Sequence, residues 1–269
     1  MSTVLTVHTT PEAETAGAVA AVIASLPVSF APAPAAPDVT AVAGHTGWTG
    51  RAAEAIRAGS RGVVVSDPVA EDPEDLAGTA AASGAMVVLD QRWAGNPALA
   101  ASHDAARAVI ADALADCVLL DSVAYGTPGA DPLTLLADHL AAVLQSGIDL
   151  DGLKVVQRSA NGYTLVGKLA NGAPAALQGI TTASVPATAT ISLLTSTGRA
   201  DITLPDPSAA WPAEIRSVTP AGATTLPTIY ESARRHSWRR LRRQLEAGGP
   251  STDLRQFAAL TSLIDRLND

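Results

Sequence analysis

Three side chains in this sequence could take part in acid–base chemistry. Asp67 follows the β-branched run 63–65, and Asp121 and Tyr125 lie four residues apart in a second apolar run. A tyrosine, with an ordinary pKa of about 10, needs a neighbouring cation to act as a general acid or base near neutral pH. An aspartate becomes a general base at that pH only where burial raises its pKa. These three residues are the candidate acid–base groups of the chain.

Other common chemistries lack their motifs. The histidines form no H-x-x-x-H or H-E-x-x-H pattern, and Cys117 is the only cysteine, so no metal site is expected. No G-x-S-x-G elbow is present, which argues against a Ser-His-Asp hydrolase. The histidines are His8, His45, His103, His139 and His236.

The N-terminal third predicts a strand, a turn and a helix, over residues 4–7 and 11–26. A dinucleotide-binding fold carries glycines at such a turn, so that the cofactor pyrophosphate can approach backbone amides at the helix start. Here the turn reads His8-Thr9-Thr10-Pro11-Glu12-Ala13, without glycine. Pro11 removes an amide donor, and Glu12 and Glu14 repel phosphate. The second predicted strand, 28–30, runs into a proline-rich loop without the acidic residue that would hold a ribose.

The order of the predicted elements indicates two domains. About eight residues separate Phe30 from Val39, too few for another strand–helix unit, so the first domain is shortened. A helix is expected over 131–145, an antiparallel meander from Leu153 onward, and two helices over 228–247 and 253–267. We therefore expect an α/β protein: a truncated Rossmann-like domain over 1–100, and an α+β domain with a large, mainly antiparallel open sheet over 101–269.

Charge and hydropathy limit the possible partners and the cellular location of the protein. A net charge of −8 and a pI near 5.0 argue against a surface that coats nucleic acid. An arginine-rich helix near the C-terminus leaves such a role as a third hypothesis, which predicts binding that weakens steeply with salt. No apolar run is long enough to span a membrane, and no signal peptide is recognisable, so we expect a cytoplasmic protein. The helix carries Arg234, Arg235, Arg239, Arg240, Arg242 and Arg243.

Several of these segments follow one another in the order of a known family. Residues 39–44 and 52–59 resemble the strand, small-residue turn and A-x-x-A-l-x-A-G helix of the glucose-fructose oxidoreductase / inositol dehydrogenase / rhizopine-catabolism (Gfo/Idh/MocA) family. That family continues with a strand into Glu-Lys-Pro, and this chain reads Ser66-Asp67-Pro68. Its D-x-G-x-[HY] motif is matched at the ends by Asp121 and Tyr125, with Val123 in place of the glycine. Residues 195–202 resemble its E-G-T-x-G segment.

The resemblance implies roles for these positions. The family's lysine is the proposed catalytic group, and Asp67 stands in its place; the last residue of the D-x-G-x-[HY] motif is a proposed proton donor, which maps to Tyr125. Members commonly form oligomers through the open face of the C-terminal sheet. The chain is thus similar to a shortened, catalytically degenerate member of the family.

Two functions follow from this comparison. The first is a non-catalytic protein that binds a sugar-like ligand, or supports an active oxidoreductase partner in a homo- or hetero-oligomer, and binds no cofactor. The alternative is an active NAD- or NADP-dependent oxidoreductase on a sugar or polyol, with Tyr125 as proton donor and Asp67 as base.

Overall fold

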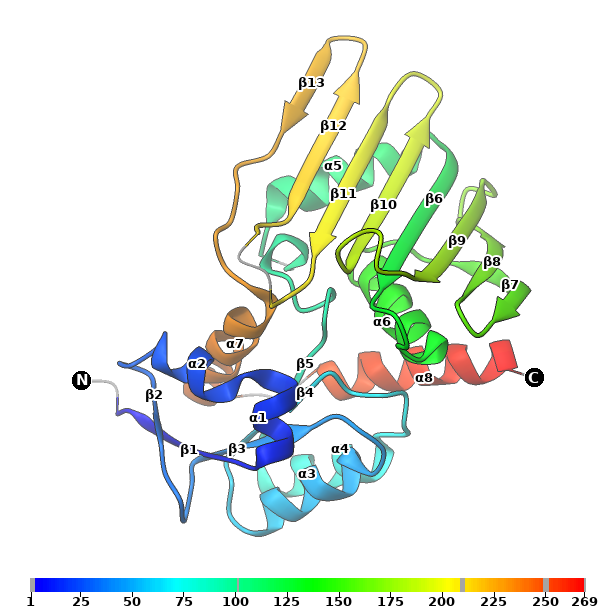
Figure 1. The fold of residues 1–269 in the computed structure, drawn as a ribbon. Coiled ribbons are helices and arrows are strands. Elements are labelled where there is room, and N and C mark those ends of the chain that lie inside the picture. Colours follow the sequence, from blue (N-terminus) through cyan, green and yellow to red (C-terminus); the bar gives the residue numbers. More distant parts are fainter. Residues whose placement is uncertain (1–2, 101, 209–210, 249–251, 269) are drawn as a thin grey trace. The chain divides into compact units, whose positions relative to one another are not determined.

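The computed structural model describes residues 3–100, 102–208, 211–248 and 252–268, which form two compact units (Figure 1). Unit 1 contains the chain up to Gln91 together with Ala233–Asp265, and unit 2 contains Arg92–Ser232 with the residues after Asp265. The predicted segments 1–100 and 101–269 differ from these units chiefly in the C-terminal helix pair, which packs with unit 1. Its apolar stripe belongs to the core of that unit, as Trp238 shows by its edge-to-face contact with Phe30, at 5.1 Å between ring centroids.

Unit 1 is built on a parallel sheet in the order β2-β1-β3-β4-β5. Only residues 33–38 connect β2 to β3, which lies on the far side of β1, so no helix covers this crossover. The expected shortened Rossmann-like fold is confirmed. The strands are β1 (Leu5–Thr9), β2 (Phe30–Pro32), β3 (Val39–Ala43), β4 (Gly62–Ser66) and β5 (Met86–Asp90).

Helices cover both faces of this sheet. Apolar side chains of α1, α2 and α7 share one core with alternate strand residues such as Val7, Ala41 and Val64, while α3 packs on β3, β4 and α4. The helix expected over 11–26 is broken at Ala18, which adopts a left-handed conformation with φ of 46°. The helices are α1 (Pro11–Gly17), α2 (Val19–Ala24), α3 (Trp48–Arg57), α4 (Glu74–Ser83), α7 (Ala233–Ala247) and α8 (Asp253–Asn268), the last belonging to unit 1 as far as Asp265.

Unit 2 is built on a sheet in the order β13-β12-β11-β10-β6-β9-β8-β7. Every pair is antiparallel except β6–β9, which confirms the expected large, mainly antiparallel sheet. The strands are β6 (Cys117–Gly126), β7 (Asp151–Ser159), β8 (Gly162–Lys168), β9 (Pro174–Thr181), β10 (Thr188–Thr195), β11 (Arg199–Pro205), β12 (Glu214–Thr219) and β13 (Gly222–Thr225); the helical elements are η1 (Pro97–Leu99), α5 (Asp104–Ala115) and α6 (Pro132–Gln145).

The two faces of this sheet differ in polarity. Along β10, buried Ala189, Ile191 and Leu193 alternate with half-buried residues such as Thr190 and Ser192, and helices α5 and α6 pack on this sheet. Such alternation is typical of a sheet with one face on the core and the other toward solvent. Among the described residues, no helix is long and apolar enough to cross a membrane.

Candidate functional site

The candidate site lies at the carboxyl edge of the unit 1 sheet. In open parallel sheets ligands bind outside the carboxyl ends of the strands. In this sheet the strand order reverses between β1 and β3, and β4 and β5 end at the same edge. In this unit β4 ends at Ser66 and β5 ends at Asp90, so the loops that follow them meet at this edge. The backbone amide of Asp67 donates to the carbonyl of Asp90 at 3.0 Å. The candidate Asp67 is therefore tied to the neighbouring strand end.

The loop around Asp67 has little freedom to move. Asp67 adopts a left-handed conformation with φ of 50°, which is uncommon for a residue other than glycine. Gly44, at the end of the neighbouring strand, lies so close that a Cβ there would be 2.4 Å from the Cα of Pro68 and 2.5 Å from the carbonyl of Asp67. Only glycine fits at this position, so the loops after β3 and β4 interlock.

An arginine from the C-terminal part of the chain joins two carboxylates at this edge. Arg234 of α7 donates from one guanidinium nitrogen to Asp67 at 3.0 Å and from the other to Asp90 at 3.2 Å. The side chain of Arg234 is 12% exposed and that of Asp90 is 2% exposed. We call Asp67, Arg234 and Asp90 the edge triad. With all three groups ionised it carries one net negative charge.

Burial changes the protonation of this triad. It raises the pKa of Asp90 to about 6; the carboxylate of Asp67 adds to the increase, and the charge of Arg234 opposes it. The two carboxylates keep the pKa of Arg234 above its already high ordinary value, against the effect of burial. The guanidinium therefore stays positively charged and does not act as a proton donor in acid–base catalysis near neutral pH.

Substitution of Asp90 tests this assignment. Because the pKa of Asp90 is about 6 in the folded state against 3.8 as the ordinary value, its contribution to stability is complete below pH 4 and falls as pH rises toward 6. We expect Asp90→Asn to remove this decline, which amounts to at most about 1.4 kcal/mol per pH unit. Urea unfolding between pH 4 and 7 measures it, with Asp75→Asn on the exposed surface of α4 as control. Equal pH dependence in wild type and Asp90→Asn would refute the assignment.

The remaining arginines of α7 also include several that bind within unit 1. Arg240 pairs with Asp253 at 2.6 Å and donates to the carbonyl of Leu89 at 3.1 Å. Arg242 donates to the carbonyls of Thr3 and Ser29. Arg240 and Arg242 thus attach α7 to neighbouring segments of unit 1.

Arg234 is not among the acid–base candidates drawn from the sequence, although the sequence carries a signal for it. Arg234, Trp238, Leu241 and Leu245 follow one another at helical spacing, so the arginine continues the apolar stripe of α7 by one turn. A charged residue on a buried stripe requires a partner of opposite charge. The two aspartates at the ends of adjacent parallel strands meet this requirement.

The turn between β1 and α1 does not fit a dinucleotide pyrophosphate. The amide of Ala13 donates a hydrogen bond to the hydroxyl oxygen of Thr10, with 3.3 Å between nitrogen and oxygen. Pro11 has no amide proton. The amide of Ala20, in the first turn of α2, donates a hydrogen bond to the carboxylate of Glu14 at 2.9 Å and is therefore not free for a ligand. A backbone hydrogen bond lowers the pKa of Glu12, which keeps a negative charge at the helix start. At this turn the amide of Ala13 is thus occupied, Pro11 offers none, and a carboxylate lies beside the helix start.

A cavity of about 730 Å³ lies beside β1 and β3. His8 of β1 and Thr40 of β3, which are register partners, line it together with Arg51 of α3 and the loop 34–37. A crossover helix between β2 and β3 would cover a face of the sheet. In this chain residues 33–38 make the connection without a helix. Residues of this short connection thus form part of the cavity wall.

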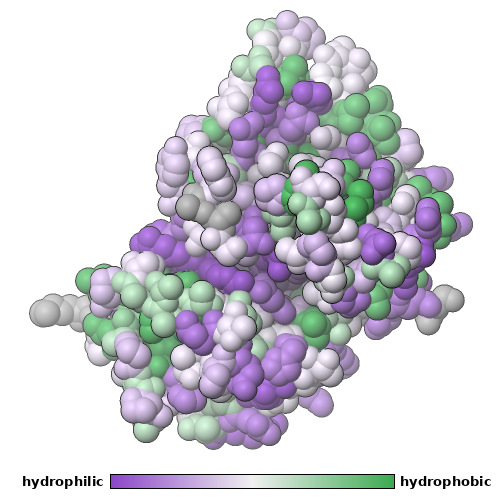
Figure 2. Space-filling view, in the orientation of Figure 1, coloured by the Kyte–Doolittle hydropathy of each residue, from purple (hydrophilic) through white to green (hydrophobic). Residues whose placement is uncertain are grey.

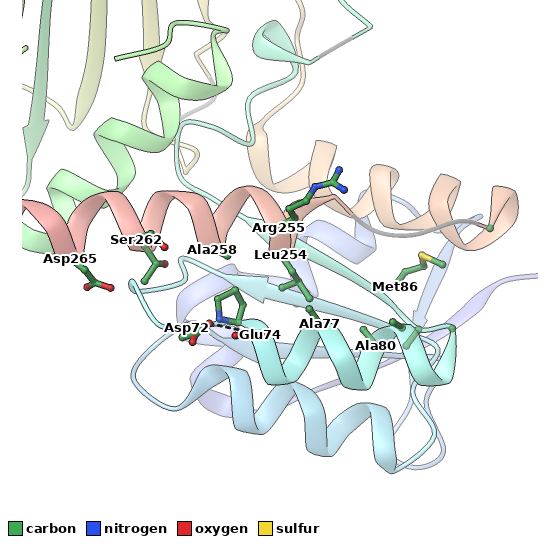
Figure 3. A pocket seen from close by; sticks show the side chains of 16 residues that line it. Asp72, Glu74, Ala77, Ala80, Met86, Leu254, Arg255, Ala258, Ser262 and Asp265 are labelled. Carbon is green, nitrogen blue, oxygen red and sulfur yellow. Dashed lines mark hydrogen bonds between the residues drawn. The ribbon is translucent and has the colours of Figure 1, made fainter. Parts of the chain in front are cut away.

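A second cavity, of about 810 Å³, lies between α4 and α8 (Figure 3). Small side chains such as Ala77 and Ala258 form its walls, with the carboxylates of Asp72 and Asp265 on one side and Met86 on the other. None of the candidate residues Asp67, Asp121 and Tyr125 lines either cavity.

Asp121 and Tyr125 belong to unit 2 and lie on a strand. The motif they resemble begins a helix, but here both are part of β6, and helix α6 begins only at Pro132. They occupy alternate positions on the half-exposed side of β6, with Val123 between them. Residues four apart on a strand are about 13 Å apart along it, so the two side chains do not form a compact pair.

A buried hydrogen-bond chain crosses unit 2 close to these residues. The hydroxyl of Ser122 donates to the carbonyl of Thr190 at 2.8 Å, and its oxygen lies 2.6 Å from His139 Nε2. His139 Nδ1 lies 3.0 Å from the hydroxyl of Tyr163. Since the Ser122 hydroxyl donates its one proton to Thr190, His139 Nε2 donates to the Ser122 oxygen. Burial lowers the pKa of His139 and keeps the ring neutral, so Nδ1 accepts from the hydroxyl of Tyr163.

The hydrogen-bonded network of Ser122, His139 and Tyr163 has a structural role, not a catalytic one. Ser122 and His139 are completely buried, and burial lowers the pKa of His139 to about 3 and raises that of Tyr163 well above its ordinary value. The ring of Tyr163 rests on Gly179, where an added Cβ would lie 2.1 Å from a ring carbon. A serine nucleophile needs access to substrate and a base that can accept its proton, and neither condition holds here.

Arg92 organises a second charged group in unit 2. It contacts Asp206 at 3.0 Å and Asp138 at 3.5 Å, and its guanidinium lies 5.9 Å from the ring centre of Trp93. No group of three or more histidine, cysteine or acidic side chains suited to a metal ion occurs in the described part of the chain.

Comparisons with known proteins place this architecture. No protein-family model matches the chain, and no curated protein sequence matches it. A variant of KijD10, a 3-ketoreductase from Actinomadura kijaniata solved with TDP-benzene and NADP, matches with a TM-score of 0.70 and 14% identity over 99% of this chain and 97% of that one. UDP-N-acetylglucosamine 3-dehydrogenase GnnA from Acidithiobacillus ferrooxidans matches with a TM-score of 0.67 and 13% identity over 99% and 97%. The chain shares the fold of these two enzymes over nearly its whole length.

Proposed function

We propose that this chain is a Gfo/Idh/MocA-type protein that neither binds NAD(P) nor transfers a hydride, and that it acts by binding a sugar-like ligand or by supporting an active oxidoreductase partner. The fold likeness to two sugar-modifying oxidoreductases and the order of the motifs support the family. The edge triad carries the argument against catalysis, because it occupies the position at which the resemblance places the lysine.

Neither Asp67 nor Arg234 takes over the role of the family's lysine at this position. A lysine there would be a single cation able to hold and release a proton, whereas Asp67 is an anion paired with Arg234 at 3.0 Å. The guanidinium does not release its proton at neutral pH, and both its outer nitrogens already donate to carboxylates. Neither group is available to protonate the oxygen of a carbonyl that accepts hydride, or to take the hydroxyl proton of an alcohol that donates hydride.

The start of α1 gives independent support. Pro11, Glu12 and Glu14 lie where a dinucleotide pyrophosphate needs glycines and free amides, and the amides of Ala13 and Ala20 already donate to side chains. Placing a phosphate beside carboxylates costs electrostatic energy instead of releasing it. A hydride-transfer protein without this contact would have to hold its cofactor by other means.

The proposed activity is therefore binding. The half-exposed face of the unit 2 sheet, which includes Asp121 and Tyr125 on β6, is the surface offered to a second subunit, of the same chain or of an active oxidoreductase. Tyr125 can still orient a sugar hydroxyl as a hydrogen-bond donor. The engagement of Arg234, Arg240 and Arg242 within unit 1 argues against nucleic acid as a partner. We place the protein in the cytoplasm.

One observation favours the alternative, an active NAD- or NADP-dependent oxidoreductase on a sugar or polyol. The matched KijD10 structure contains NADP, and this chain has an open cavity of about 730 Å³ beside β1 and β3. In that case Tyr125 would donate the proton and Asp67 would act as base.

A turnover assay separates the two functions. The protein is incubated with NAD⁺ or NADP⁺ and a panel of sugars, polyols and nucleotide sugars, and formation of the reduced nicotinamide is followed by absorbance. We expect no rate above that of a protein-free control. A rate that Tyr125→Phe abolishes, while the exposed variant Tyr230→Phe leaves it unchanged, would establish the alternative.

A further inference from the structure

The cavity between α4 and α8 plays no part in the proposed function. Its volume of about 810 Å³ falls within the roughly 300–1,000 Å³ typical of sites for small organic molecules. The residues that line it all belong to unit 1, and none of them is a member of the edge triad. The cavity is therefore a separate candidate site within unit 1.

The middle of this cavity has apolar walls. Because most of these side chains end at Cβ, they leave space between the two helices. Met86 of β5 lies at one end (Figure 3), and its thioether makes favourable contacts with aromatic rings. The face of unit 1 seen in Figure 2 mixes hydrophobic and hydrophilic residues, whereas this wall is more uniformly apolar and suits a flat aromatic body. The wall residues are Ala77, Ala80 and Ala81 of α4 and Leu254 and Ala258 of α8.

The opposite end of the cavity is acidic. Asp72 and Glu74, at the start of α4, and Asp265, near the end of α8, lie on the side away from Met86 (Figure 3). None of these three carboxylates forms an ion pair in the described part of the chain. Among the described lining residues Arg255 is the only cation, and Figure 3 shows its side chain pointing away from α4. This end of the cavity therefore attracts positive charge.

A buried hydroxyl without a partner lies in the same wall. Thr261 of α8 lines the cavity and is 7% exposed, and its Oγ1 has no hydrogen-bond partner among the described residues. Native structures rarely leave a buried hydroxyl unsatisfied. Ala258, Thr261 and Asp265 follow one another at helical spacing, so the wall passes from apolar through hydroxyl to carboxylate along α8. A ligand that places a polar group beside Thr261 would supply the missing partner.

We infer that this cavity binds a small organic cation, with an aromatic body against the alanines and Met86 and an ammonium group among Asp72, Glu74 and Asp265. The three carboxylates repel an anion. A sugar would place its hydroxyls against walls that offer them few partners. The inference does not depend on the proposed function, which concerns other residues and a different ligand, so either can fail without the other.

Calorimetric titration of the full chain with three naphthalene derivatives tests the charge preference. Naphthylethylamine, a cation, should bind saturably at submillimolar concentration; neutral naphthylethanol should bind about fivefold more weakly, and anionic naphthylacetate should not bind. The double variant Asp72→Asn, Asp265→Asn should weaken binding of the amine about fivefold and leave that of the alcohol unchanged. Asparagine at position 72 can still accept the amide of Glu74. Asp75→Asn, an exposed position of α4 that does not line the cavity, is the matched control.

A methionine signal locates the binding. The chain has two methionines, and that of Met86 is assigned with Met86→Leu in a sample labelled at the methionine methyl groups. Its resonance should shift when naphthylethylamine is added, because the aromatic ring lies against it. Ala258→Phe, which fills the middle of the cavity, should weaken binding of both the amine and the alcohol. No saturable binding of the amine, equal affinity for amine and alcohol, or amine binding that leaves the Met86 signal in place would overturn the inference.

Discussion

Replacing Arg234 by methionine is expected to lower the free energy of unfolding by about 3–5 kcal/mol near neutral pH. The substitution leaves Asp67 and Asp90 at the sheet edge without their shared cation, and the side chain of Asp90 is only 2% exposed. Removing one partner of a buried ion pair is costly because the remaining charge keeps its desolvation penalty. At pH 5 the cost should be smaller, because Asp90, whose pKa is about 6 beside Arg234 and rises further without that cation, is then protonated in both proteins.

Equilibrium urea unfolding followed by circular dichroism measures this effect. Arg243→Met is the matched control, since Arg243 is an exposed residue on the same helix, and we expect its effect to stay within about 0.5 kcal/mol. Arg234→Lys should fall between the two, because a single ammonium group cannot make the paired contacts of a planar guanidinium. A loss below about 1 kcal/mol for Arg234→Met would mean that the triad does not hold α7 to the sheet.

The second large effect is an acid sensitivity that depends on His139. Its pKa is about 3 in the folded state against an ordinary value of 6.5, because the ring is completely buried. Stability from this group is complete above pH 6.5 and is lost as the pH falls toward 3, because the unfolded chain then binds a proton that the folded chain excludes. The loss reaches about 1.4 kcal/mol per pH unit, or about 5 kcal/mol over the window.

His139→Gln provides the test, because glutamine can occupy part of the network but does not titrate. The variant should be less stable than wild type at pH 7, by about 1–3 kcal/mol for the imperfect hydrogen bonds to Ser122 and Tyr163. Its unfolding free energy should then decline less steeply toward acid than that of wild type. His45→Gln, at an exposed position of unit 1, serves as control. Parallel pH profiles for wild type and His139→Gln would contradict the assignment of a neutral, buried imidazole.

Much of the fold follows from local patterns. The short interval between Phe30 and Val39 predicts the missing strand–helix unit, because a crossover needs a minimum length of chain. Helix α6 starts where Asp131 and Pro132 predict, and Asp131 accepts the amides of Leu133 and Thr134. These features depend on residues close in sequence, whose effect on the backbone is direct.

The edge triad could not be predicted in the same way. Arg234 and Asp67 are 167 residues apart, and their contact depends on how α7 packs on the sheet. The close packing of α1 on β4 was equally hidden from the sequence: a Cβ at Gly17 would lie 2.4 Å from the hydroxyl of Ser66. The resemblance to the family motif predicts a helix start at Asp121 and Tyr125. Both residues lie on a strand instead, because β6 extends to Gly126. Long-range packing decides all three.

The most direct test of the proposed function is a calorimetric titration of the purified protein with NADH and NADPH up to millimolar concentration. The proposal predicts no saturable heat with either cofactor. Pro11 offers no amide proton to the pyrophosphate, and the carboxylates of Glu12 and Glu14 repel it. Saturable binding of either one, competed by its oxidised form, would contradict the proposal and identify the protein as a cofactor-binding oxidoreductase.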